Sequence, residues 1–306
     1  MNQKCIICNS DTGNTSIICD KCIHPQNTIK RTELFTTILS TFRNTAQMGF
    51  DLLKITCKHL ADSLEKIHLD FTPTIVFDEK VHSKCIDAVA QSYMQNKVWF
   101  NNFVPLSSEP DRNCLYHSIK LLMPTMTASV IELRVRVMIE VVNNYEIYTA
   151  RYSNLNEICD ELPIYCRELK DKEYSQIWDI LGLCDVLKCR IRLTYAKDPW
   201  FDLAHLHPLQ NMYSPIKNDP NIINTITLMW TNVLSEKDLL RGNKAFHTGH
   251  FVPLLMRTEL RTKPGNRFAF FILFFQTCNI DMEFEPFLLS FLIVLETFRA
   301  TCRLIS

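Results

Sequence analysis

Residues 111–119, with the sequence DRNCLYHSI, place one cysteine between a polar turn and an apolar helical pattern. Apolar side chains recur at helical spacing from Leu115 onward, and Pro124 ends the pattern. We therefore expect Cys114 at or near the N-terminus of a helix. Free backbone N–H groups and the helix dipole at such a terminus favour the thiolate and so lower the pKa of the thiol. The same N–H groups can line an oxyanion hole for an acyl-transfer intermediate.

A thiolate nucleophile needs an imidazole partner, and a later segment supplies one. Residues 247–255, with the sequence HTGHFVPLL, contain two histidines. His250 is the better candidate because it enters a predicted strand directly after Gly249, whereas His247 lies in the preceding loop. His250 stands 136 residues after Cys114, so only the tertiary fold can bring the two together.

The cysteine segment resembles a known nucleophile motif. Residues 111–116, DRNCLY, look like the D-G-N-C-[LF]-[FY] string of OTU-type cysteine peptidases. Further segments resemble landmarks of that family in the same order, namely a tryptophan-containing helix, a strand and a histidine strand: residues 174–180 (YSQIWDI), 190–195 and 250–254 (HFVPL). Together with residues 224–230, the set is most similar to the vertnin-like, often transposon-associated branch of that fold, and it covers residues 97–257.

This resemblance implies a papain-like α/β (α+β) fold that hydrolyses isopeptide or peptide bonds after ubiquitin or a similar modifier. It makes Cys114 the nucleophile and His250 the general base and then the general acid. Asp111, with the backbone N–H groups near Arg112, Asn113 and Cys114, would shape the oxyanion loop. The resemblance implies no cofactor for catalysis, and its partner is ubiquitin or a ubiquitin-like modifier.

Two departures from the family pattern favour a second hypothesis. Arg112 occupies the usual glycine position, where an arginine is strained if the backbone needs a positive φ. The family often orients its histidine with Asp or Asn two residues later, but that position is Val252. The third group is therefore unassigned, with Asp111 as one candidate. The alternative function is a catalytically inactive OTU-like module of a regulatory or transposon-derived protein, binding protein or nucleic acid.

The N-terminal cysteines predict a metal site. Cys5 and Cys8 form one C-x2-C knuckle, and Cys19 and Cys22 form a second, with ten residues between them. Zinc prefers four tetrahedral thiolate or imidazole ligands, and the two-residue gap lets two sulfurs of one turn reach the same ion. We expect a structural zinc ribbon or knuckle, whose partner is a protein or a nucleic acid. So short a segment depends on the metal for much of its stability.

Composition shifts predict four parts along the chain. We expect a zinc module over residues 1–25, a helical connector over 30–96, the OTU-like domain over 97–257 and an apolar tail over 258–306. The apolar runs of the tail, residues 268–275 and 287–295, are shorter than the roughly 18–20 residues of a membrane-spanning helix, so we expect no membrane partner.

Within these parts, periodicity and turn residues predict individual elements. The pattern is helical over residues 32–69, with Gly49 as an interruption, and Asp78 is the expected N-cap of a helix reaching Asn96. Ser129 begins a capping-box string whose helix would expose Arg134 and Arg136 to solvent. A further helix is expected over residues 174–187, and strands are expected over 190–195, 224–230 and 249–256.

Composition narrows the function classes. The 306 residues carry 33 Lys and Arg against 33 Asp and Glu, so the net charge is zero, which argues against a basic nucleic-acid coat. Only six glycines are present, and no Gly-rich phosphate-loop string occurs. Thirteen cysteines without an N-terminal apolar leader favour free thiols and metal ligands, and hence the cytoplasm or nucleus. Eight of the cysteines are expected to be buried packing residues.

Overall fold

The computed structural model describes residues 28–64, 67, 69, 71–95, 97–153, 160–168, 172–195, 210–216, 224–235, 238, 241–242 and 249–257, together with Ser10. The predicted zinc ligands Cys5, Cys8, Cys19 and Cys22 lie outside these residues, as does the apolar tail over 258–306. The zinc site and the tail therefore stay predictions. None of the described helices is long and apolar enough to cross a membrane.

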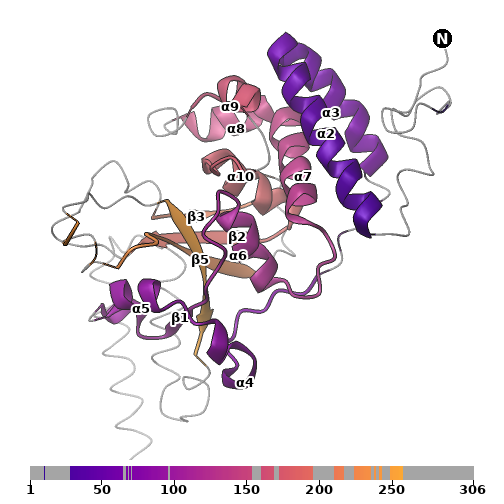
Figure 1. The fold of residues 1–306 in the computed structure, drawn as a ribbon. Helices are drawn as coiled ribbons and strands as arrows, with labels where there is room; N and C mark the ends of the chain where they lie inside the picture. The colour runs from indigo at the N-terminus through magenta and orange to yellow at the C-terminus, as the bar shows by residue number, and fades with distance from the viewer. Residues whose placement is uncertain are drawn as a thin grey trace, which may run out of the picture. The chain divides into compact units, whose positions relative to one another are not determined.

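A mixed sheet lies at the centre of the described residues (Figure 1). Its five strands follow the order β1-β5-β4-β2-β3, with β2 and β4 parallel and all other neighbours antiparallel. The strands are β1 Phe103–Pro105, β2 Arg190–Tyr195, β3 Met212–Tyr213, β4 Thr225–Thr231 and β5 His250–Met256. The three strands expected from sequence are confirmed as β2, β4 and β5, and the mixed α/β class is confirmed with them.

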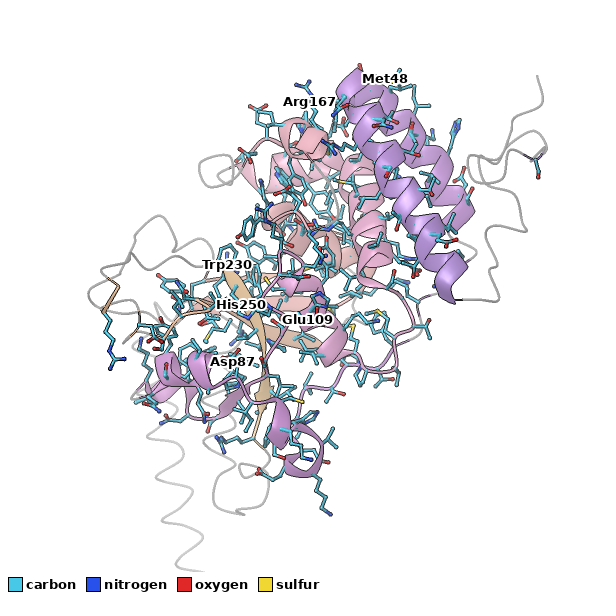
Figure 2. The ribbon with its side chains drawn as sticks, in the orientation of Figure 1. Met48, Asp87, Glu109, Arg167, Trp230 and His250 are labelled. Carbon is cyan, nitrogen blue, oxygen red and sulfur yellow. The ribbon has the colours of Figure 1, made fainter. Side chains whose placement is uncertain are left out.

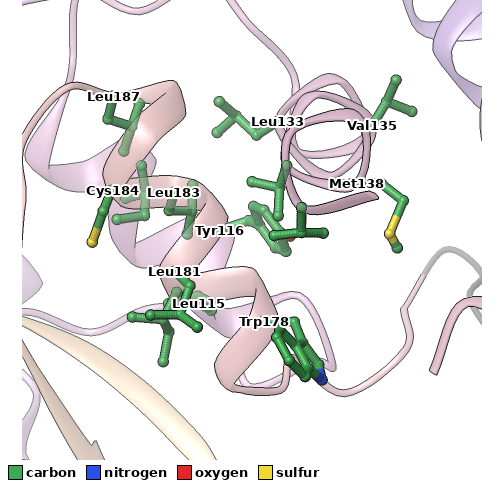
Figure 3. Packing of buried hydrophobic residues seen from close by; sticks show 14 of the residues in the cluster. Leu115, Tyr116, Leu133, Val135, Met138, Trp178, Leu181, Leu183, Cys184 and Leu187 are labelled. Atoms are coloured by element: carbon green, nitrogen blue, oxygen red, sulfur yellow. The ribbon is translucent and has the colours of Figure 1, made fainter. Parts of the chain in front are cut away.

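Two helices contact one face of the sheet, and a third helix packs on both of them. The helix α6 Cys114–Leu122 packs on β5, and α7 Val130–Asn143 packs against α10 Ile177–Val186, which contacts β2 and β3. Figure 3 shows Tyr116 of α6 in one buried cluster with side chains of α7 and α10. Ser129 caps α7 by accepting a hydrogen bond from the Glu132 N–H, as predicted.

Glycine allows the close approach of α10 to α7. A Cβ at Gly182 would lie 2.8 Å from Val137 Cγ1 and 2.9 Å from Val141 Cγ1, which is shorter than carbon atoms tolerate. The helix α10 begins at Ile177, three residues later than expected, because Gln176 and Asp179 form a capping box there. Tyr174 is consequently exposed outside the helix.

The predicted helical connector begins with two helices, and their buried side chains belong to the same hydrophobic core as those of the sheet. The helices α2 Thr28–Met48 and α3 Phe50–Leu64 meet at Gly49, whose φ of +150° is rarely open to other residues, so the predicted interruption is confirmed. Both helices pack against α7, and α2 also packs against α9 Leu162–Glu168. Arg31 of α2 forms two hydrogen bonds of 2.8 Å with buried Glu132. The connector thus contributes to the core of the sheet domain.

The prediction of a single helix from Asp78 to Asn96 is wrong. Asp78 does cap a helix by accepting from the Lys80 N–H, but that helix, α4 Glu79–His82, has four residues. A 3-10 turn, η1 Ser83–Cys85, follows, and α5 Ala88–Met94 begins after a second cap at Asp87. The chain breaks because Ile86 forms an antiparallel β-bridge with Leu106.

The opposite face of the sheet carries a smaller apolar cluster. It joins α5 and the 3-10 turn η2 Val98–Phe100 to inward side chains of β4 and β5: Ala90, Tyr93, Met94, Phe100, Met229, Val252 and Leu254.

The short helix α8 Tyr145–Arg151 follows α7 and buries Tyr148. Of the eight expected packing thiols, Cys57, Cys166, Cys184 and Cys189 are buried, whereas Cys85 is exposed. The others, Cys159, Cys278 and Cys302, lie outside the described residues.

Candidate active site

The thiol of Cys114 lies against the backbone on both sides of His250. Cys114 is the first residue of α6, as predicted, and is 3% exposed. Its Sγ accepts a hydrogen bond from the Phe251 N–H at 3.4 Å and lies 4.0 Å from the Gly249 carbonyl oxygen. The fold therefore brings the cysteine loop to the start of β5, where the chosen histidine stands.

Burial raises the pKa of the Cys114 thiol, so the expected lowering is wrong for this state of the protein. The backbone N–H groups of Phe251 and Leu115 do favour the thiolate, but the loss of solvent outweighs them. Asp111 adds a further, smaller increase. A helix N-terminus lowers a thiol pKa only when its effect exceeds the opposing effect of burial, and local sequence does not report that burial.

His250 opens β5 opposite Thr231 of β4, and its side chain is buried (Figure 2). Burial lowers the pKa of His250, although the carboxylates of Asp87 and Asp111 act in the opposite direction. The ring is therefore neutral near neutral pH and can accept a proton. Its polar contact among the described residues is Ser108 Oγ, which lies 3.4 Å from Nε2.

Asp111 organises the loop ahead of the cysteine. Its carboxylate accepts the Asn113 N–H at 2.8 Å, and its carbonyl oxygen accepts the Cys114 N–H at 3.1 Å. The same carboxylate lies 3.3 Å from His117 Nε2, and the described structure shows no hydrogen bond from it to His250. Asp111 as the third catalytic group, and these N–H groups as an oxyanion loop, therefore stay predictions.

Arg112 fits its position without backbone strain. Among the described residues, the non-glycine positions with positive φ are Lys172 and Lys188, so Arg112 has no left-handed conformation. Its guanidinium lies 4.9 Å from the Tyr174 ring centroid and 3.8 Å from a carboxylate oxygen of Glu173. An arginine at position 112 therefore causes no backbone strain in the turn.

The side chain of Asn113 points into the protein, toward the guanidinium of Arg134. Its Oδ1 accepts a hydrogen bond of 2.8 Å from Arg134 Nη2. Arg134 was expected in solvent but is 1% exposed, and Arg136 is also largely buried beside Glu132. One signal could have located Arg134, because apolar side chains follow it three, four and seven residues later on the same helical face.

Arg134 belongs to a buried polar network beneath the cysteine loop. It lies 3.7 Å from Asp179 Oδ1 and donates a hydrogen bond of 2.8 Å to the Glu173 carbonyl oxygen. The Asp179 carboxylate accepts hydrogen bonds from the hydroxyls of Tyr116 and Tyr165. Burial, and then the nearby carboxylate, raise the pKa of both tyrosines well above the usual range, so both remain donors.

The position two residues after His250 offers no polar group. Alternate residues of a strand face the same side of a sheet, so His250 and Val252 share one face. Val252 is fully buried in the apolar cluster with Ala90 and Met229. An acidic or amide partner for the imidazole must therefore come from elsewhere in the chain.

The sequence matches no protein-family model and no curated protein. Among solved structures, the chain is similar to the OTU domain of OTUD1, with 13% identity and a TM-score of 0.32 over 55% of this chain and 95% of that one. It is also similar to the viral OTU domain protease from Qalyub virus, with 13% identity and a TM-score of 0.31 over 52% of this chain and 87% of that one. TM-scores at this level do not establish a common fold.

The raised thiol pKa predicts how Cys114 reacts with iodoacetamide. Below its pKa the sulfur is mostly a protonated thiol, which alkylates poorly, so the rate at Cys114 should go on increasing with pH beyond the point at which an unburied cysteine reaches its plateau. Site-resolved mass spectrometry measures that rate against pH, in the folded protein and in urea. The half-maximal rate in the folded protein should fall at higher pH than in urea. Exposed Cys85 is the internal control, and a half-maximal rate at lower pH in the folded protein would contradict the prediction.

Proposed function

We propose that residues 97–257 form an OTU-like cysteine peptidase that hydrolyses isopeptide or peptide bonds after ubiquitin or a similar modifier. Cys114 is the nucleophile, His250 is the general base, and Asp111, Arg112 and Asn113 form the oxyanion loop. We place this activity in the cytoplasm or nucleus, where free thiols persist.

One observation carries the proposal. The Phe251 N–H donates to Cys114 Sγ at 3.4 Å, although 137 residues separate them. A buried thiol at a helix N-terminus thus adjoins the strand residue whose imidazole is neutral and able to accept a proton. The order of nucleophile, tryptophan helix, strand and histidine strand along the chain supports the same reading.

The chemistry follows from the neutral state of both groups. As Sγ attacks the substrate carbonyl carbon, the thiol proton passes to the His250 imidazole. Collapse of the tetrahedral intermediate breaks the C–N bond, and the imidazolium gives its proton to the leaving amine. His250 then takes a proton from water, whose oxygen attacks the thioester, and the carboxylic acid leaves as Cys114 regains its proton.

A second proposal, an inactive OTU-like binding module, has its own support. The contacts of Cys114 Sγ in the described structure are main-chain atoms, and the position of Val252 supplies no carboxylate to the imidazole. An inactive module would keep the fold and bind a protein or nucleic acid without forming a covalent intermediate. The two proposals therefore differ in whether a covalent adduct forms at Cys114.

Ubiquitin carrying a C-terminal electrophile tests the proposed function. We expect a covalent adduct on Cys114, located by peptide mass spectrometry, and none on exposed Cys85. The Cys114→Ser variant should form no adduct, because its hydroxyl is a far weaker nucleophile. Absence of any adduct on the wild-type chain, while an active OTU peptidase is labelled in parallel, would favour the inactive module.

We also propose one structural zinc ion held by Cys5, Cys8, Cys19 and Cys22. Metal analysis of the purified protein should find one zinc per chain, because the two C-x2-C knuckles supply a closed tetrahedral set. The paired variant Cys5→Ser with Cys8→Ser should lose the metal, whereas Cys85→Ser, at an exposed cysteine outside the module, should retain it. Purified protein without zinc, whose four N-terminal cysteines alkylate freely, would contradict the proposal.

A further inference from the structure

We propose that Ser108 is the residue that positions His250 and fixes its proton on Nε2, leaving Nδ1 as the nitrogen that accepts a proton. The inference rests on the proposed function for its catalytic meaning, but the tautomer itself is independent of any activity. Ser108 takes the place that a carboxylate or amide at position 252 would otherwise fill.

Ser108 is held rigidly beside the imidazole. It is 5% exposed and follows β1, where the Leu106 N–H donates to the Pro253 carbonyl oxygen of β5 at 3.0 Å. Its Oγ lies 2.5 Å from the Phe251 carbonyl oxygen and 3.4 Å from His250 Nε2. The hydroxyl therefore lies between the main chain and the ring of adjacent residues on one strand.

The single proton of the hydroxyl decides the tautomer. The Phe251 carbonyl oxygen can only accept, so at 2.5 Å it must receive the one O–H of Ser108. Toward Nε2 the Ser108 oxygen then has only lone pairs to offer. An unprotonated Nε2 would face those lone pairs, so the favoured neutral ring has its proton on Nε2 and donates it to Ser108.

The distance of 3.4 Å is long for a hydrogen bond, as is common in catalytic sites without substrate. With Nε2 engaged, Nδ1 keeps its lone pair, and no described residue donates a hydrogen bond to it. A base of defined tautomer is what proton transfer from a neutral thiol needs. Ser108 thus supplies through a hydroxyl the orientation that Val252 cannot supply.

Ser118 provides a matched control for this role. Its Oγ donates to the same Phe251 carbonyl oxygen at 2.9 Å, but the described structure shows no contact between it and the ring. Loss of either hydroxyl removes one hydrogen bond to that carbonyl, whereas only loss of Ser108 removes the acceptor from Nε2. A merely structural role predicts equal effects of the two changes.

The test is 15N NMR of the histidine side chains at mildly alkaline pH, with the His250 signals assigned by their loss in His250→Gln. We expect the Nε2–H tautomer in the wild-type chain and in Ser118→Ala, and a shift toward a mixture of tautomers in Ser108→Ala. Ser108→Thr, which keeps the hydroxyl, should restore the wild-type pattern. A wild-type proton on Nδ1, or equal shifts in the two alanine variants, would overturn the inference.

Kinetics supply the catalytic half of the test. With a fluorogenic ubiquitin substrate, Ser108→Ala should lower kcat at least about tenfold and leave KM unchanged, because the serine acts on the base and not on binding. Ser108→Thr should recover most of kcat, and Ser118→Ala should change it little. A wild-type chain that shows the Nε2–H tautomer but no turnover would refute the proposed function and leave the positioning role standing.

Discussion

Replacing His250 with glutamine is expected to lower kcat/KM by about 10^4-fold or more, because removal of the general base from a nucleophile–histidine pair has effects of this size. Glutamine keeps a polar amide near Ser108 but accepts no proton at neutral pH. Cys114, already a poor thiolate because burial raises its pKa, then has no group to take its proton. Turnover of a ubiquitin substrate and labelling by the electrophilic ubiquitin should fall together.

The fold should survive this change, which separates loss of chemistry from loss of structure. His250→Gln should melt within a few degrees of the wild-type chain and keep its circular dichroism spectrum. Val252→Asp is an informative companion, because it places a carboxylate two residues after His250 but buries it among apolar side chains. If the folded His250→Gln variant keeps turnover within about tenfold of the wild-type chain, His250 is not the general base.

Replacing Arg134 with methionine is expected to lower the free energy of unfolding by about 3–5 kcal/mol, the usual effect of removing one partner of a buried ion pair. Asp179 would lose its cationic partner in a site where both side chains are almost fully buried. Asn113, next to the nucleophile, would lose its hydrogen bond to the guanidinium. Urea denaturation followed by circular dichroism measures the change.

A double variant separates charge from packing. Adding Asp179→Asn to Arg134→Met removes the uncompensated charge and keeps one of the two oxygens that accept the Tyr116 and Tyr165 hydroxyls, so part of the lost stability should return. Lys54→Met, which breaks the exposed Lys54–Glu146 pair, should leave the denaturation midpoint nearly unchanged. A loss below about 1 kcal/mol in Arg134→Met would show that the network contributes little to folding.

Local sequence patterns predicted the elements whose cause is local. The strand over residues 190–195 is predicted to the residue, since a run of β-branched and apolar side chains bounded by turn residues suffices for it. The Ser129 cap, the break at Gly49 and the helix beginning at Cys114 depend on groups within a few residues of each other. The helix expected up to Asn96 was wrong because a distant residue, Leu106, pairs with Ile86 and breaks it.

For the candidate site as well, local sequence predicted some features, and others depend on distant segments. Spacing and motif placed Cys114 at a helix terminus and His250 at a strand start, and the fold brings these segments together. The helix terminus predicted a lowered pKa for the Cys114 thiol, whereas burial raises that pKa. The burial depends on which distant segments pack over the end of the helix, and a local pattern does not report them. No sequence motif identifies Ser108, because its proposed role depends on contact between its hydroxyl and a strand more than a hundred residues away.

The sequence by itself predicted which residues would carry the proposed chemistry: one cysteine after a polar turn, one histidine opening a strand and four N-terminal cysteines at metal-ligand spacing. Only the tertiary structure decided their surroundings, because hydrophobic periodicity reports which face is buried but not which groups meet there. Arg134 shows this most directly, since an arginine on an apolar helical face is buried only where a partner such as Asp179 compensates its charge. That partner stands 45 residues further along the chain, beyond the reach of any local pattern.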